Sequence, residues 1–115
     1  TSEGPAANMA LNVAVLLSGS GTTLQNLIDR AESGALDIAI SCVISSRLAA
    51  GGVERARKHR IPAYEVPRKE CATEEEFNER IWAIVRQHEA QLVVLAGFMS
   101  LLCVPPDFTD RIINI

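Results

Sequence analysis

The chain has 115 residues, of which 48% are hydrophobic and 22% are charged, and its formal net charge at pH 7 is −3. This length has room for one domain, and a weakly acidic charge of mixed sign argues against a nucleic-acid surface. The apolar runs are shorter than the roughly 18 residues of a membrane span, and no signal peptide opens the chain. We therefore expect a cytoplasmic protein that binds neither nucleic acid nor membrane.

The first ten residues are small and polar, and we expect 1–10 to be a flexible leader or a cloning remnant ahead of a domain over 11–115. Residues 11–17 are continuously apolar, which predicts a parallel strand buried on both faces. A helix is predicted from Thr23, because the residues 24, 27, 28 and 31 form one apolar face. Gly34 is placed to end this helix as a C-terminal cap.

The rest of the chain repeats the alternation of strand and helix. Strands are predicted at 38–44, 63–66, 92–96 and 111–115, with a helix over 49–60 and a short helix-prone segment over 97–103. Thr73 and Glu76 have the spacing of a capping box that opens a helix with an apolar stripe, from which Trp82 lies off centre. Pro62 and Pro67 flank the strand at 63–66, so we expect it at a sheet edge.

This alternation is typical of the α/β class, and it predicts a Rossmann-like fold of three layers around a mostly parallel sheet. We expect the strand order 3-2-1-4-5, with the sheet truncated after the fifth strand. The order reverses between the first and fourth strands, and ligands bind in such folds beyond the carboxyl ends of the strands at that point. Residues 18–21 and 97–99 follow those two ends.

The turn at 19–21, Gly-Ser-Gly, is the strongest local signal, because it joins an apolar strand to a helix. Backbone N–H groups and hydroxyls meet there beside a helix N-terminus, which favours a phosphate. The turn is not a Walker A loop, since no Gly-Lys-Ser/Thr follows. It fits the dinucleotide fingerprint poorly, because Leu24 stands where that motif has its third glycine.

Arg47 leaves a second function open, because an arginine after the second strand can accept the 2′-phosphate of NADP. The chain would then be the NADP-binding half-domain of an oxidoreductase, although an exposed loop arginine is the simpler interpretation. Three cysteines match no zinc spacing and no disulfide framework, and we expect Cys42 and Cys103 to be buried and the protein to need no metal.

Three sequence blocks together resemble the phosphoribosylglycinamide formyltransferase family. They are L-S-G-S-G-T-T-L-Q at 17–25, E-R-A-R at 54–57 and V-V-L-A-G-F-M at 93–99, the last followed by R-I-I-N-I at 111–115. The resemblance covers 11–115 and implies transfer of a formyl group from 10-formyltetrahydrofolate to glycinamide ribonucleotide in purine biosynthesis, with the folate as co-substrate and no metal.

The resemblance also implies roles for particular residues. The substrate phosphate would be held by Ser20, Gly21, Thr22 and Thr23, although Thr23 stands where family members often have asparagine. The pterin pocket of the folate would be lined by Met99, Ser100, Leu101, Leu102 and Asn114, and Asn114 would match the catalytic asparagine. Glu74 stands near a position where some members carry a folate-side arginine.

In the family the asparagine works with a histidine two positions later and with a later aspartate. Both would fall beyond Ile115, so we expect this chain to be the N-terminal part of a longer enzyme and to have little transferase activity alone. A different class of function also stays open, namely a non-catalytic fragment that only binds ligand. Its fifth strand would be exposed and able to self-associate edge to edge.

Overall fold

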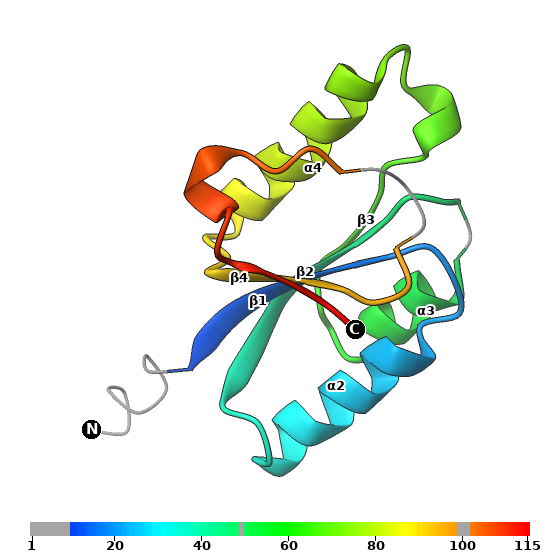
Figure 1. Cartoon of the computed structure of the whole chain (residues 1–115). Coiled ribbons are helices and arrows are strands. Elements are labelled where there is room, and N and C mark those ends of the chain that lie inside the picture. The colour runs from blue at the N-terminus through cyan, green and yellow to red at the C-terminus, as the bar shows by residue number, and fades with distance from the viewer. Residues whose placement is uncertain (1–9, 49, 99–101) are drawn as a thin grey trace.

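The computed structural model describes residues 10–48, 50–98 and 102–115, and within these ranges five parallel strands form one sheet in the order β3-β2-β1-β4-β5 (Figure 1). The strands are β1 (Leu11–Leu17), β2 (Ile38–Ser45), β3 (Ala63–Glu65), β4 (Leu92–Leu95) and β5 (Ile112–Asn114), and the helices are α2 (Thr22–Ser33), α3 (Gly51–Lys58) and α4 (Glu74–Gln87). The fold class, the strand order and the edge position of β3 are confirmed.

The sheet is covered on both faces, with α2 and α3 on one side and α4 on the other (Figure 1). Strand β1 illustrates this two-sided arrangement, because its side chains point alternately into two separate hydrophobic cores. Val13, Val15 and Leu17 pack in the cluster that contains residues of α2 and α3. Ala14 and Leu16 pack in the cluster that contains residues of α4. The continuous apolar run of β1 therefore serves two layers.

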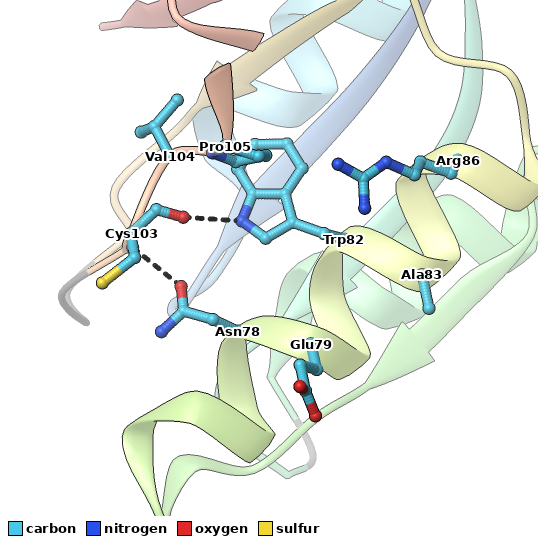
Figure 2. Close-up of a pocket in the computed structure, with 8 residues that line it drawn as sticks. All are labelled: Asn78, Glu79, Trp82, Ala83, Arg86, Cys103, Val104 and Pro105. Atoms are coloured by element: carbon cyan, nitrogen blue, oxygen red, sulfur yellow. Dashed lines mark hydrogen bonds between the residues drawn. The ribbon is translucent and has the colours of Figure 1, made fainter. Parts of the chain in front are cut away.

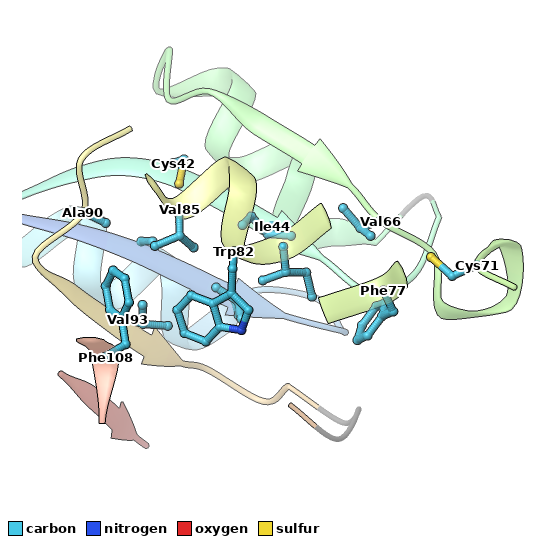
Figure 3. Close-up of a cluster of buried hydrophobic side chains, with 13 residues drawn as sticks. Cys42, Ile44, Val66, Cys71, Phe77, Trp82, Val85, Ala90, Val93 and Phe108 are labelled. Carbon is cyan, nitrogen blue, oxygen red and sulfur yellow. The ribbon is translucent and has the colours of Figure 1, made fainter. Parts of the chain in front are cut away.

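Helix α4 covers its face of the sheet with Phe77, Ile81 and Val85, all fully buried. Phe77 and Val85 are labelled in Figure 3. Trp82 is also buried, at 4% exposure, although the apolar stripe of the helix alone leaves it off centre. Phe108 covers it, with 4.9 Å between the ring centroids. Phe108 comes from a short 3-10 helix over Pro106–Phe108, so a distant segment of the chain buries this tryptophan.

Several predicted boundaries move by one or two residues. The predicted helix over 49–60 is Gly51–Lys58, and the short 3-10 helices Arg68–Glu70 and Pro106–Phe108 were not expected. In the predicted helix-prone segment 97–103, residues 99–101 lie outside the described ranges, and the described residues on either side are not helical. The predicted leader lies outside the described ranges except for residue 10.

The cysteine prediction is right for Cys42 and wrong for Cys103. Cys42 is buried, and burial raises the pKa of its thiol to about 11, whereas Cys103 is exposed. Cys103 belongs to a stretch that runs beside α4, where its backbone N–H donates to Asn78 Oδ1 at 2.8 Å. The backbone, rather than the thiol, makes the inward contact there.

The predicted capping box opens α4. Thr73 Oγ1 accepts a hydrogen bond from the Glu76 N–H at 3.1 Å, and Glu76 Oε1 accepts one from the Ala72 N–H at 3.1 Å. We predict that Thr73→Ala lowers the free energy of unfolding by about 1 kcal/mol, because it leaves one N–H of the first turn without its side-chain partner. Urea denaturation measures this, and Thr73→Ser, which keeps the hydroxyl, should stay close to the parent. Equal stability of all three proteins would rule out a contribution from the cap.

Candidate functional site

The loop between β1 and α2 leaves the N-terminus of a helix open. Gly21 precedes α2 with a φ of 82° and a ψ of 24°, a left-handed conformation that glycine adopts without strain. No side chain caps this helix, and its first turn contains no acidic residue. The N–H groups of that turn point toward the loop at the positive end of the helix dipole, which suits an anion.

Two glycines of α3 let this loop pack against the start of that helix. A Cβ atom on Gly51 would lie 2.9 Å from the carbonyl oxygen of Ser20, and a Cβ atom on Gly21 would overlap the Cα of Gly52. The Gly52 N–H donates to the carbonyl oxygen of Gly19 at 3.2 Å. Sequence reasoning missed this role of Gly51 and Gly52, and the only signal was a glycine pair where a helix was expected.

Arg55, one turn further along α3, ties the loop from the side. Its Nε donates to the carbonyl oxygen of Ser20 at 2.8 Å, and its guanidinium lies 3.4 Å from Gln25 Oε1 on α2. The residue lies in the E-R-A-R block, to which the sequence assigned no function. The carbonyl oxygens of Gly19 and Ser20 therefore accept hydrogen bonds from α3. The N–H groups at the start of α2 remain available to a ligand.

The open side of the loop faces the end of β4. A cavity of about 170 Å³ is lined by residues 19–23 together with Ala96 and Gly97, so the two predicted strand ends do meet. The hydroxyls of Ser20 and Thr22 are exposed and lie 3.2 Å apart. The four residues predicted to hold a phosphate thus line one cavity, and the volume of this cavity suits a single small anionic group.

Asn114 lies at the same end of the sheet as the loop cavity, which lies beyond the carboxyl ends of β1 and β4. In the parallel register Leu16 pairs with Leu95, and Leu95 pairs with Asn114. Asn114 is therefore two strand spacings, about 10 Å, from the end of β1. Its side chain is exposed and makes no hydrogen bond with the described residues.

The predicted folate residues are described only in part, since Met99, Ser100 and Leu101 lie outside the described ranges. Leu102 is half-buried and packs against the core on the α4 side of the sheet. Phe98 packs there too, and its ring stacks on Phe77 with 6.2 Å between centroids. Both residues that flank 99–101 are thus anchored in the core, and a role of Leu102 toward folate stays a prediction.

A groove of about 340 Å³ beside Trp82 is not part of this site (Figure 2). Two of its polar side chains bind the backbone of Cys103, because Trp82 Nε1 donates to the carbonyl oxygen of Cys103 at 2.8 Å and Asn78 Oδ1 accepts from the Cys103 N–H. These bonds hold residues 103–105 on α4. The groove is lined by none of the loop residues.

The histidines are used in structural contacts at helix ends, as expected. His59 follows α3 and lies 2.8 Å from Glu32, and His88 follows α4 and lies 2.6 Å from the hydroxyl of Tyr64. Neither lines the loop cavity. In the part of the chain that the structure describes, no three His, Cys, Asp or Glu residues gather as a metal site would need, and no helix is long and apolar enough to cross a bilayer.

Comparison with known proteins gives a consistent result. The model of a family described as formyl transferase matches residues 11–115. A phosphoribosylglycinamide formyltransferase of Haemophilus influenzae is 39% identical over 99 residues, which cover 86% of this chain and 46% of that protein. One from Dictyostelium discoideum is 35% identical over 113 residues, covering 90% of this chain and 55% of that protein.

Solved structures agree with the sequence relatives. Glycinamide ribonucleotide transformylase 1 from Symbiobacterium toebii superimposes with a TM-score of 0.86 at 33% identity, covering 91% of this chain and 50% of that one. The phosphoribosylglycinamide formyltransferase of Coxiella burnetii gives a TM-score of 0.83 at 35% identity, with the same coverage. The chain thus spans about half the length of the single-function relatives it matches.

Proposed function

The chain belongs to the formyl transferase family, and on that premise we propose that residues 11–115 are the N-terminal, phosphate-binding part of a glycinamide ribonucleotide formyltransferase. The complete protein transfers a formyl group from 10-formyltetrahydrofolate to the amine of the ribonucleotide. The similarity of the chain to phosphoribosylglycinamide formyltransferases supports this substrate pair. The single observation that carries the assignment to this chain is the uncapped N-terminus of α2 behind the loop 19–21.

In this proposal the ribonucleotide phosphate lies against the first-turn N–H groups of α2 and the hydroxyls of Ser20 and Thr22. The phosphate charge is favoured there by the helix dipole and by direct N–H donation. The loop carbonyls are already bonded to α3, through Gly52 and Arg55, so they are not free to turn toward the anion. The loop is therefore organised for phosphate before the ligand arrives, which lowers the cost of binding.

The chemistry takes place at the other end of the crevice, near Asn114. The substrate amine attacks the formyl carbon, and an oxyanion forms on the formyl oxygen. The bond from that carbon to the folate nitrogen then breaks, as the amine loses a proton and the folate nitrogen gains one. The side-chain N–H of Asn114 donates to the oxyanion, because a neutral amide donor at a strand end stabilises negative charge as it develops. The separation of Asn114 from the loop leaves room for the ribose between phosphate and amine.

The proposed partners of the complete protein are the ribonucleotide and the folate, in the cytoplasm. Self-association through β5 remains a prediction. The strand forms one edge of the sheet among the described residues, and it exposes Ile113 at 45%. Sedimentation of the purified chain over a range of concentrations tests it.

Turnover by the full-length protein tests the proposed function. We expect conversion of glycinamide ribonucleotide with 10-formyltetrahydrofolate, and calorimetric binding of 10-formyl-5,8-dideazafolate in preference to NADPH. If the chain is instead part of an NADP-dependent enzyme, NADPH should bind more tightly than 10-formyl-5,8-dideazafolate. Tight NADPH binding without formyl transfer would overturn the proposal in favour of an oxidoreductase.

A further inference from the structure

A second cavity, distinct from the glycine loop, lies beyond the carboxyl ends of β2 and β3. It has a volume of about 720 Å³ and is lined by residues 46–48 and 67–70. It shares no lining residue with the loop cavity. Both cavities lie at the edge of the sheet where ligands bind in folds of this kind.

The walls of this cavity are held by backbone hydrogen bonds. The Val66 N–H donates to the carbonyl oxygen of Ser45 at 2.8 Å, and the Arg68 N–H donates to that of Ser46 at 3.3 Å. The hydroxyl of Ser45 donates to the carbonyl oxygen of Arg47 and accepts from its N–H, at 2.7 and 3.1 Å. The two loops that form the cavity are therefore joined to each other and shaped without a ligand.

The charge of the lining is strongly positive for a chain whose net charge is −3. The lining contains three cationic residues, Arg47, Arg68 and Lys69, and one acidic residue, Glu70. Arg47 and Lys69 form no ion pair with any described residue. Three cations around one hollow repel one another, and a bound anion removes that repulsion.

Arg68 has a defined orientation in this group. Its guanidinium lies 5.8 Å from the centroid of the buried Phe77 ring, and it is 3.7 Å from Glu74, a carboxylate that is 62% exposed. A pair at that distance and exposure is weak. The guanidinium is thus positioned by the ring, and an oxyanion that reaches it gains the planar donor geometry that arginine offers.

We propose that this cavity is a second anion-binding site, which takes an organic anion through its phosphate or carboxylate group. Arg47 and Lys69 supply charge from the two loops, and Arg68 supplies oriented N–H donors. Phosphate and carboxylate share the oxyanion chemistry that this lining recognises. The site goes beyond formyl transfer and does not depend on it.

Titration of the isotope-labelled chain with inorganic phosphate, and separately with glutarate, tests the proposal by amide chemical shifts. We expect saturable shifts at residues 46–48 and 68–70 with at least one of the two probes, and the probe that saturates identifies the class of ligand. The double variant Arg47→Ala/Lys69→Ala should weaken binding at least tenfold. The control Arg57→Ala/Lys58→Ala removes the same charge from exposed positions on α3 outside the cavity, and it should change the affinity less than twofold.

The spectra of both variants report whether the fold is kept, because shifts elsewhere should match those of the parent chain. Absence of saturable shifts with both probes would overturn the proposal. Equal weakening by the two double variants would also overturn it, since that result shows a general charge effect. The amides of residues 19–23 are followed in the same spectra, so loss of the second site is distinguished from failure of the glycine loop.

Discussion

Replacing Gly21 with alanine is expected to lower the free energy of unfolding by about 3 kcal/mol. An L-residue in the left-handed region costs about 1–2 kcal/mol, and a forced steric overlap in a packed region costs about 1–3 kcal/mol. Both apply here, because Gly21 has a φ of +82° and its added Cβ would meet the backbone of Gly52. The backbone cannot rotate away as a flexible side chain does, so the loop must separate from α3. Urea denaturation measures the loss.

Gly34 provides a matched control for this variant. Gly34 also adopts a left-handed backbone conformation, with a φ of +85°, but an added Cβ would have no neighbour within 4 Å. Gly34→Ala should therefore cost only about 1 kcal/mol, from the backbone conformation alone. If the two variants lose the same stability, the close packing of the loop on α3 is not what holds Gly21 in place.

Replacing Asn114 with alanine in the full-length protein is expected to lower kcat by a factor of about 10²–10³, the usual effect of removing one donor to an oxyanion. The loss should appear in kcat more than in the KM for the ribonucleotide, because the proposed phosphate site lies two strands away at the loop. Steady-state kinetics with both substrates varied separates the two parameters.

The variant Asn114→Asp separates the effect of hydrogen-bond donation by the side chain from the effect of its size and shape. The aspartate has nearly the same size but cannot donate a hydrogen bond when ionised, so it should be as slow as the alanine variant. Ile113→Val, at an exposed neighbour on β5, is the control and should keep nearly full activity. An aspartate variant with normal kcat would show that Asn114 does not stabilise the oxyanion by donation.

The architecture could be predicted from sequence because its signals are local. The apolar run of β1 ends where the Gly-Ser-Gly turn begins, and the predicted bounds of that strand match the structure. Gly34 adopts the left-handed conformation expected of a C-terminal cap. Each of these features depends on residues within a few positions of one another, which is the range over which sequence patterns carry information.

Features that depend on distant contacts could not be predicted. The burial of Trp82 requires Phe108, and the exposure of Cys103 follows from the path of its segment beside α4. The glycine pair 51–52 is unfavourable for a helix when considered alone, and its reason appears only when the loop at 19–21 is packed against it. The four loop residues were predicted from sequence as a phosphate site, whereas the α3 contacts that organise the loop were not predicted.

In the proposed function, the open N-terminus of α2 binds the phosphate of the ribonucleotide. Titrating the isotope-labelled chain with glycinamide ribonucleotide, and in parallel with the riboside that lacks the phosphate, tests it most directly. We expect the amides of residues 19–23 to shift and saturate with the ribonucleotide and to stay unchanged with the riboside. If those amides remain silent while another surface responds, or respond equally to the riboside, the claim is contradicted.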